Sequence, residues 1–386
     1  MAGYPRFINR IEDVERLRPE EKETLKKVTE KFAFRTNEYY LSLINWDDPN
    51  DPIRRLVIPS PEELHEWGAL DPSNEARYTV MRGVEHKYRS TVLFLVNNVC
   101  GSICRYCFRK RLFMKNAHDT LRPQDLDRAV EYVRSHPEVN NVLLTGGDPL
   151  MFPTRRLEEI ISKLRQIDHV DTIRIGTKIP AFNPYRITED PSLLEMIEKY
   201  STPEKRIYII SHFSHPREIT PQAIKAVDML LKSGAILANQ NPLIRGVNDD
   251  PRVLAELFNK LQAIGDPPYY VFQCRPASGN RAYSVPVEEA YDIVEEAKKP
   301  VSGLAKRARY ILSHATGKVE VIAKTDSHIL FRYHQAADPG DIGRVMIFRR
   351  NPEAYWLDDY LVQGEISVEG IGMEKGGLDE EEHVET

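Results

Sequence analysis

Residues 91–107, which read TVLFLVNNVCGSICRYC, decide the fold of this chain. The first part, Val92–Val96, is a short apolar run of the kind that forms a buried parallel strand. The second part places Cys100, Cys104 and Cys107 in a CxxxCxxC spacing directly after that strand. A strand that leads into reactive side chains indicates an α/β protein with a site at its strand ends.

Five further runs of this kind follow, and segments of helical periodicity separate them. Strand starts ~30–50 residues apart suit strand–loop–helix–loop units, which imply right-handed crossovers and a parallel sheet. The six predicted strands are Val92–Val96, Asn141–Thr145, Thr172–Gly176, Ile207–Ser211, Ala235–Gln240 and Tyr270–Cys274. The predicted helices between them are Leu126–Val133, Leu157–Ile167, Leu193–Tyr200, Ala223–Ser233 and Val253–Ile264.

Polar or reactive residues follow every one of these strands. A doubly wound sheet would concentrate such residues at one switch point, whereas a barrel collects them along one rim. We therefore predict an α/β fold, an open partial (β/α)6 barrel of the TIM type. After the cysteines, the strand-end residues are Gly146-Gly147-Asp148-Pro149, Thr177-Lys178, His212, Gln240 with Asn241, and Arg275.

The segments on either side of this repeat have a different pattern. Residues 1–90 are highly charged and partly helical, so an N-terminal helical extension is expected there, before a barrel over 91–300. Residues 301–373 are expected to form a mainly β segment, and 374–386 a solvated acidic tail. Four alternating runs predict antiparallel strands in the β segment: Arg307–Ser313, Lys318–Ala323, His328–Tyr333 and Arg344–Phe348.

Composition limits the classes of function. Lys and Arg total 53 and Asp and Glu 58, so the net charge is 53 − 58 = −5, which argues against a nucleic-acid-coating protein. No apolar run approaches the ~18 residues of a membrane span, and no signal-peptide core opens the chain. Three of the four cysteines are clustered, which suits a reducing cytoplasm rather than a disulfide framework.

The three cysteines are one ligand short of an ordinary metal site. Structural zinc normally takes four protein ligands, and iron–sulfur clusters are normally held by four cysteines. A four-iron cluster held by three thiolates would have one iron open to a small molecule. Three buried cysteines, or half of a zinc site, are the alternatives that the spacing leaves open.

Three other motifs carry candidate chemistry. The Gly146-Gly147 turn lets the backbone approach a ligand closely, although such turns are often only turns. Lys318 follows a small-residue turn and could bind pyridoxal phosphate, or be one of many surface lysines. Lys87-Tyr88-Arg89 could hold a phosphate, or form an ordinary exposed charged patch.

These motifs together resemble the lysine 2,3-aminomutase family of radical S-adenosylmethionine (radical SAM) enzymes. The likeness runs from about residue 35 to about residue 350. Its landmarks are residues 39–44 (YYLSLI), 48–52 (DPNDP), 104–111 (CRYCFRKR), 145–148 (TGGD), 212–216 (HFSHP), 239–240 (NQ), 243–249 (LIRGVND), 269–274 (YYVFQC) and 317–318 (GK).

The resemblance implies an isomerase that moves an α-amino group to the β-carbon of an amino acid. It implies a [4Fe-4S] cluster on the three cysteines, S-adenosyl-L-methionine on that cluster, and pyridoxal 5′-phosphate on Lys318. Arg109 would receive the substrate α-carboxylate, a bidentate task that suits guanidinium. The remaining cofactor-binding positions that the resemblance implies are Gly146, Gly147, Asp148, His212 and Gln240 beside S-adenosylmethionine, and Lys87, Tyr88 and Arg89 beside pyridoxal phosphate.

Two departures from the family pattern concern the substrate. Lysine-specific members place an aspartate where this chain has Arg275, and another near the position of Ser313 or His314. A cationic Arg275 would repel a lysine side chain and attract a carboxylate, so L-glutamate is the predicted substrate. The alternatives are L-lysine, free or in a translation factor, and a structural salt bridge for Arg275. A non-catalytic iron–sulfur or zinc scaffold is the alternative from another class.

A third departure concerns zinc and assembly. Where lysine aminomutases carry a zinc-binding cysteine, this chain has Asp250, and no cysteine follows Cys274. No structural zinc is therefore expected, and a homo-oligomer is possible without being implied. Cys274 is expected to be a buried strand thiol. The remaining expected partner is an electron donor such as flavodoxin or ferredoxin, with no nucleic acid and no membrane.

Overall fold

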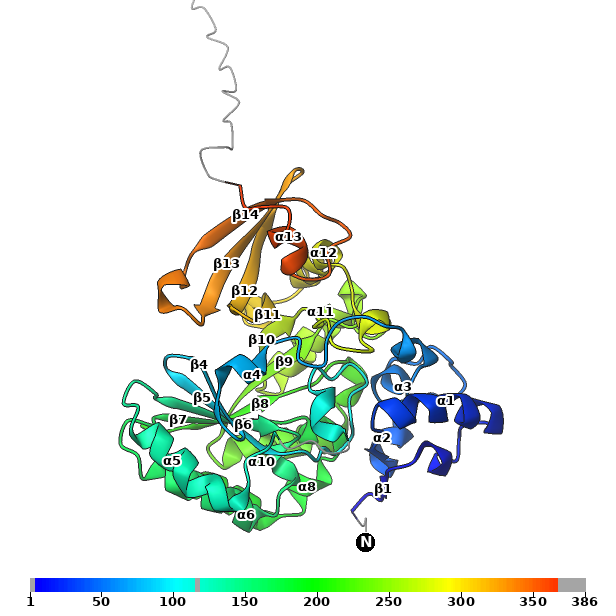
Figure 1. Ribbon diagram of the computed structural model, residues 1–386. Helices are drawn as coiled ribbons and strands as arrows, with labels where there is room; N and C mark the ends of the chain where they lie inside the picture. The colour runs from blue at the N-terminus through cyan, green and yellow to red at the C-terminus, as the bar shows by residue number, and fades with distance from the viewer. Residues whose placement is uncertain (1–3, 115–118, 367–386) are drawn as a thin grey trace, which may run out of the picture.

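The structure is a computed structural model that describes residues 4–114 and 119–366 (Figure 1). Its main element in the described residues is one twelve-stranded sheet, in which the six predicted barrel strands lie side by side and are parallel. This confirms the predicted partial barrel. Those strands are β5 (Thr91–Asn97), β6 (Asn141–Gly146), β7 (Thr172–Gly176), β8 (Ile207–Ser211), β9 (Ile236–Pro242) and β10 (Pro268–Phe272).

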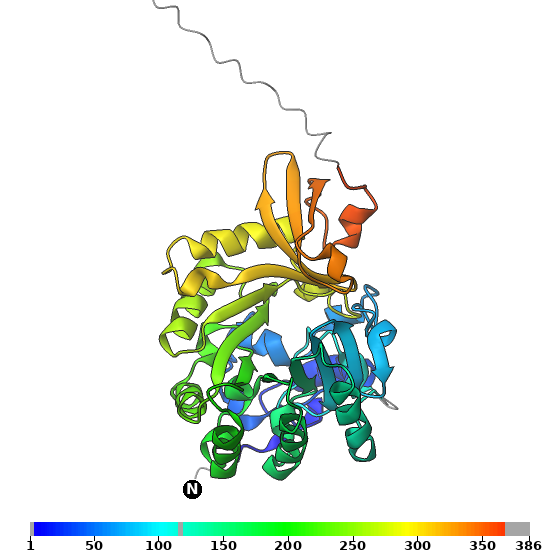
Figure 2. The same ribbon diagram turned by 90° about the vertical axis from the view of Figure 1, so that its left-hand side faces the viewer.

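Helices cover the outer face of the curved sheet, as Figure 2 shows. Two of them, α10 (Pro221–Lys232) and α11 (Pro251–Ala263), begin with a proline that directly follows a capping residue. The Thr220 side chain accepts from the N–H of Ala223, and the Asp250 side chain accepts from the N–H of Arg252. Asp250 is therefore a helix cap. The helices that follow the strands are α5 (Leu126–Arg134), α6 (Thr154–Arg165), α9 (Pro191–Tyr200), α10 (Pro221–Lys232), α11 (Pro251–Ala263) and α12 (Val287–Lys298).

Alternation along each strand separates the core from the site. In β6, Val142 and Leu144 are fully buried against the helices, whereas Leu143 and Thr145 line a cavity on the other face. In β7, Ile173 and Ile175 are buried in the same way. The sheet thus buries one face in the core and presents the other to the site.

The sheet continues through both ends of the predicted barrel. β11 (Arg309–His314) pairs antiparallel with β12 (Gly317–Lys324), and the later strands continue antiparallel, which confirms the antiparallel runs predicted for the C-terminal segment. β11 also pairs parallel with β10, which joins this segment to the barrel. The sheet crosses the expected divisions at residues 90 and 300 without a break. Its outer strands are β13 (His328–Ala336) and β14 (Val345–Arg349) at one edge, and β4 (Val84–Tyr88) and β3 (Thr79–Met81) at the other.

The N-terminal segment lies beside the barrel and has its own apolar cluster (Figure 1). It contains α1 (Pro19–Lys31), α2 (Glu38–Ser42), α3 (Pro52–Val57) and a short 3-10 helix, Pro61–Leu64. Its buried Tyr40 and Ile53 belong to one cluster with Tyr106 of the cysteine loop. In the described ranges no helix is long and apolar enough to cross a membrane. The expected acidic tail, 374–386, lies outside the described residues.

Candidate functional site

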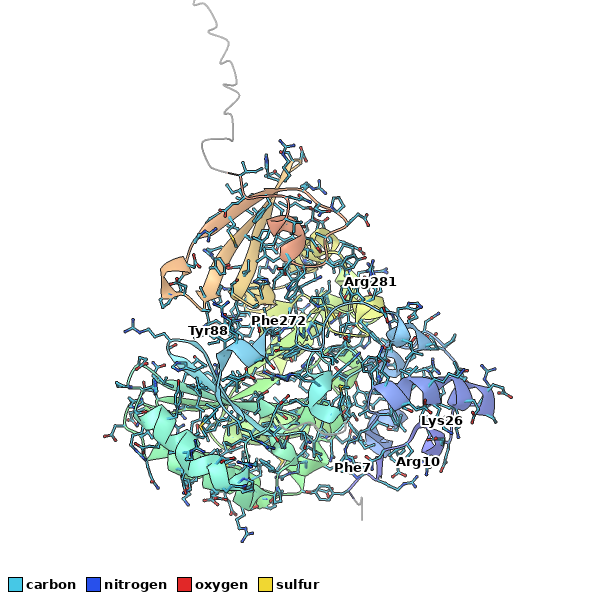
Figure 3. All side chains as sticks on the ribbon, in the orientation of Figure 1. Phe7, Arg10, Lys26, Tyr88, Phe272 and Arg281 are labelled. Atoms are coloured by element: carbon cyan, nitrogen blue, oxygen red, sulfur yellow. The ribbon has the colours of Figure 1, made fainter. Side chains whose placement is uncertain are left out.

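A cavity of about 310 Å³ opens where the parallel strands end. Every predicted site residue except Arg89 lines it: Cys100, Cys104, Cys107, Gly146, Gly147, Asp148, His212, Gln240, Lys87, Tyr88, Arg109, Arg275, Ser313 and Lys318. Arg89 is exposed in the short turn between β4 and β5 and does not line the cavity. Figure 3 labels Tyr88 and Phe272, which meet this cavity below the C-terminal strands.

The cysteine loop offers three thiols to one cavity. Burial raises the pKa of Cys100 and Cys107 above the ordinary thiol value and that of Cys104 to about 12. No three His, Cys, Asp or Glu side chains in the described ranges converge closely enough to hold a single ion. A four-iron cluster needs no such convergence, because each thiolate binds a different iron, and its charge would favour the thiolates. The donor set therefore fits the cluster.

The Gly-Gly-Asp loop is packed against the segment that leads to the cysteines. Gly146 has φ of +115°, and a Cβ on Gly147 would lie 2.5 Å from the carbonyl oxygen of Val99. The N–H of Gly147 donates to Asn97 O at 2.7 Å, so it serves this packing. Asp148 accepts from the Thr177 hydroxyl at 2.7 Å, and burial raises its pKa to about 6. These residues join neighbouring strand ends beside the cysteines.

His212 lies in a polar network on the same side of the cavity. Its Nε2 is 3.0 Å from the Tyr106 hydroxyl, and its carbonyl oxygen accepts from Lys178 Nζ at 2.8 Å. Burial holds the pKa of His212 well below its usual value, with Lys178 adding to the effect. Lys178 is balanced by Glu218 at 2.8 Å, and both side chains are buried. A neutral imidazole is thus held against the cysteine loop.

Lys318 lines the cavity from the start of β12. Its Nζ lies 5.0 Å from the centre of the Tyr270 ring and 5.6 Å from that of Tyr88. Burial, followed by the charges of Arg174, Arg275 and Lys87, lowers its pKa to about 7. An amine that is about half neutral at neutral pH fits the nucleophile that pyridoxal phosphate requires.

Arg174 is a residue at this site that the sequence analysis missed. It lies in β7, lines the cavity, and donates from Nε to Asn141 Oδ1 at 2.8 Å. Burial lowers its pKa. Lys87 lies nearby, donates to the carbonyl oxygen of His314, and has a pKa lowered to about 7, mainly by burial. Arg174 and Lys87 give the Lys318 side of the cavity a basic lining that suits a phosphate.

Arg109 is already paired with an acid that the sequence did not reveal. Its Nε donates to Glu75 Oε1 at 2.9 Å, and its Nη1 donates to the Thr145 hydroxyl at 3.1 Å. Glu75 also pairs with Arg111 at 2.6 Å. A guanidinium has five N–H donors, so Arg109 keeps donors for a carboxylate in the cavity.

Arg275 is held in the cavity wall by neutral groups. It donates from Nη1 to Ser73 Oγ at 2.6 Å and from Nη2 to Ser313 Oγ at 2.8 Å. Its guanidinium carbon lies 3.6 Å from the centre of the Phe108 ring. Within the described residues it forms no ion pair with Asp or Glu, so the structural salt bridge is not seen there. Burial lowers its pKa to about 10, which leaves it cationic at neutral pH.

Glu85 and Cys274 complete the lining. Burial, followed by the charge of Glu75, raises the pKa of Glu85 to about 8, and its Oε1 has no hydrogen-bond partner among the described residues. Cys274 is 2% exposed, and burial raises its pKa to about 11. It follows β10 instead of ending it, so its expected place in the strand is off by two residues.

Comparison with known proteins gives one family. Residues 94–258 match the radical SAM superfamily. A protein of Aquifex aeolicus named "Putative L-lysine 2,3-aminomutase" is 55% identical over 361 residues, which are 93% of this chain and 96% of the relative. L-lysine 2,3-aminomutase of Clostridium subterminale is 39% identical over 76% of this chain and 71% of the relative. Glutamate 2,3-aminomutase of Clostridioides difficile is 36% identical over 77% and 70%.

Proposed function

We propose that this chain, which belongs to the lysine 2,3-aminomutase family of radical SAM enzymes, acts on L-glutamate. As a member of this family it is an isomerase that uses a [4Fe-4S] cluster, S-adenosyl-L-methionine and pyridoxal 5′-phosphate. When bound, the cluster and S-adenosylmethionine supply a carbon-centred radical, and pyridoxal phosphate supplies the conjugated ring that carries the amino group.

The chain's own residues divide the work between two sides of the cavity. Cys100, Cys104 and Cys107 hold the cluster on the side of the Gly-Gly-Asp loop and His212. On the other side, Lys318 provides a neutral amine for the coenzyme, and Lys87 with Arg174 bind its phosphate. The substrate lies between the two sides.

The observation that carries the choice of glutamate is the cation of Arg275 in the cavity lining. In the described part of the chain its side chain hydrogen-bonds to hydroxyls, stacks on a ring face and forms no ion pair, although the charges of Glu75 and Glu85 act on it from further away. A substrate side-chain carboxylate would supply a direct ion-pair partner, while Arg109 receives the α-carboxylate. A lysine ammonium would instead meet a like charge in a site of low dielectric.

A second candidate substrate is L-lysine. Two of the three relatives described above, and further ones at 33–39% identity, carry the lysine 2,3-aminomutase name. Glu85 also offers a buried carboxyl oxygen without a partner among the described residues. An ionised Glu85 would accept an ammonium group. Arg275 stands against this arrangement, since its charge acts on the same space.

Exchange of the charge at Arg275 tests the proposal. The full chain is reconstituted anaerobically with both cofactors, and the amino-acid products of wild type and Arg275→Asp are identified by mass spectrometry. We expect wild type to turn over glutamate, and the variant to lose glutamate turnover and to gain lysine turnover. Turnover of lysine by wild type and its loss in the variant would contradict the proposal.

A flavodoxin or ferredoxin is the proposed electron donor for the cluster, and a reducing cytoplasm is the proposed location.

A further inference from the structure

The backbone of the cysteine loop is bonded to the N-terminal segment in several places. Arg35 donates from Nε to the carbonyl oxygen of Cys100 at 2.8 Å, and its own carbonyl accepts from the N–H of Ile103 at 2.9 Å. Asn37 donates from Nδ2 to the carbonyl oxygen of Gly101 at 3.1 Å. These bonds fix the carbonyl groups of Cys100 and Gly101 and the N–H of Ile103 where the loop begins.

Arg105, between the second and third cysteines, extends these contacts. Its N–H donates to Leu56 O at 2.9 Å, and its Nη1 donates to Ala33 O at 2.8 Å. Its Nε and Nη2 form a bidentate pair with Glu63 at 2.9 and 2.8 Å. The two side chains are 1% and 0% exposed. Arg105 does not line the cavity, so this charge serves the loop and not a ligand.

Glu63 also binds the far end of the loop. Its Oε2 lies 3.5 Å from Nζ of Lys110, three residues after Cys107, and its Oε1 accepts from the Tyr283 hydroxyl at 3.1 Å. Lys110 is 5% exposed and donates to the carbonyl oxygen of Ser278 at 3.1 Å. One buried carboxylate therefore joins both flanks of Cys107 to the barrel and to the N-terminal segment.

A loop that must present three sulfurs in a fixed arrangement loses conformational entropy when it is ordered. If neighbouring residues order the loop in advance, cluster binding does not bear that cost. Buried ion pairs seldom add much stability over apolar contacts, and their best-supported role is to fix one arrangement. The contacts of residues 33–63 with the cysteine loop are of this kind, because they fix one arrangement of the loop.

We propose that residues 33–63 form a collar that holds the loop of residues 100–107 in its cluster-binding shape before the cluster is present. Asn37 and Glu63 act in it as positioning residues. The collar concerns cluster retention only, so it holds whichever amino acid is the substrate.

Hydrogen exchange of the cluster-free full chain tests the collar directly. In wild type, the N–H groups of Ile103 and Arg105 are expected to be protected. Asn37→Ala removes the bonds to the carbonyl oxygens of Gly101 and Phe182 and the cap on the N–H of Tyr40 without leaving a buried charge. It should speed exchange in residues 100–107 by about tenfold or more, because one of the lost hydrogen bonds holds the loop itself. Glu63→Gln removes the shared carboxylate and should have a larger effect.

Iron content after anaerobic reconstitution is the second readout, with pyridoxal phosphate content as the measure of an intact fold. Both variants should retain less iron per chain at unchanged pyridoxal phosphate. The matched control is Glu38→Gln, which breaks the exposed pair with Arg6 in the same segment. If Glu63→Gln also loses pyridoxal phosphate, its fold is disturbed, and the result for Asn37→Ala then decides whether the collar holds the loop. Wild-type exchange in residues 100–107 and full iron content in Asn37→Ala would overturn the proposal.

Discussion

The lowered pKa of Lys318 has a consequence that can be measured without the cluster. A lysine with the ordinary pKa of ~10.4 is about 0.1% neutral at pH ~7.5, whereas one with a pKa of about 7 is mostly neutral. The reactive fraction is thus higher by nearly three orders of magnitude. Because only the neutral amine attacks an aldehyde, capture of pyridoxal phosphate should rise with pH through about 7 and level off above it.

Arg174→Met removes the neighbouring charge that contributes most to this shift after burial. The midpoint should rise by about one pH unit, which corresponds to ~1.4 kcal/mol. Stopped-flow absorbance with pyridoxal, which lacks the phosphate, follows the amine separately from phosphate binding. Arg155→Met removes an exposed charge in α6 and serves as the control. Two results would show that Lys318 is not an amine with a lowered pKa. One is a wild-type midpoint near ~10, and the other is an absorbance change of the same size in Lys318→Met as in wild type.

Three other variants test Arg275 and Glu75 of the site and Asp266, a buried carboxyl group outside the cavity that accepts from the Ser211 hydroxyl. Arg275→Met should lower kcat/KM for glutamate by about 10²- to 10³-fold, since a charge pair at ~4 Å is worth ~4 kcal/mol at an effective dielectric of ~20. The control is Arg281→Met, which removes a similar stack on Tyr355 and should leave kcat/KM unchanged, because Arg281 (labelled in Figure 3) does not line the cavity. Glu75→Gln should lower the free energy of unfolding in urea by about 3–5 kcal/mol, because Arg109 and Arg111 lose their shared carboxylate; a change below ~1 kcal/mol would contradict the pairing. Burial raises the pKa of Asp266 to about 7, so the folded state keeps a proton that the unfolded state releases near ~4. The free energy of unfolding should therefore fall as the pH rises between these two values. Asp266→Asn should remove this part of the fall when urea melts are measured over a series of pH values.

The barrel could be predicted because buried parallel strands have a simple signature. Strands that pack one face against helices and line the interior of the barrel with the other are rich in apolar residues, and all six predicted runs are neighbouring strands in the structure. The rim followed from the same signature, because parallel strands end at the same edge. This explains why so many site residues could be found from their position after a strand.

The parts that escaped prediction depend on contacts between distant segments. Arg174 lies inside an apolar run, and only alternation in the assembled sheet shows that it faces the cavity. Glu75 is 34 residues from Arg109, and no local pattern marks the pair. Arg89 is adjacent to Tyr88 but sits in a turn, where its side chain is exposed. The role of residues 33–63 was likewise hidden, since their pattern shows only short helices and charge.

Isomerisation of glutamate by this family member can be measured in one competition experiment. The anaerobically reconstituted wild-type chain is given equal amounts of isotope-labelled glutamate and lysine, and the products are identified by mass spectrometry. We expect labelled 3-aminoglutarate, the β-amino product of glutamate, with lysine unchanged. Formation of labelled β-lysine with glutamate unchanged would contradict it, and would place the side-chain contact on Glu85 instead of Arg275.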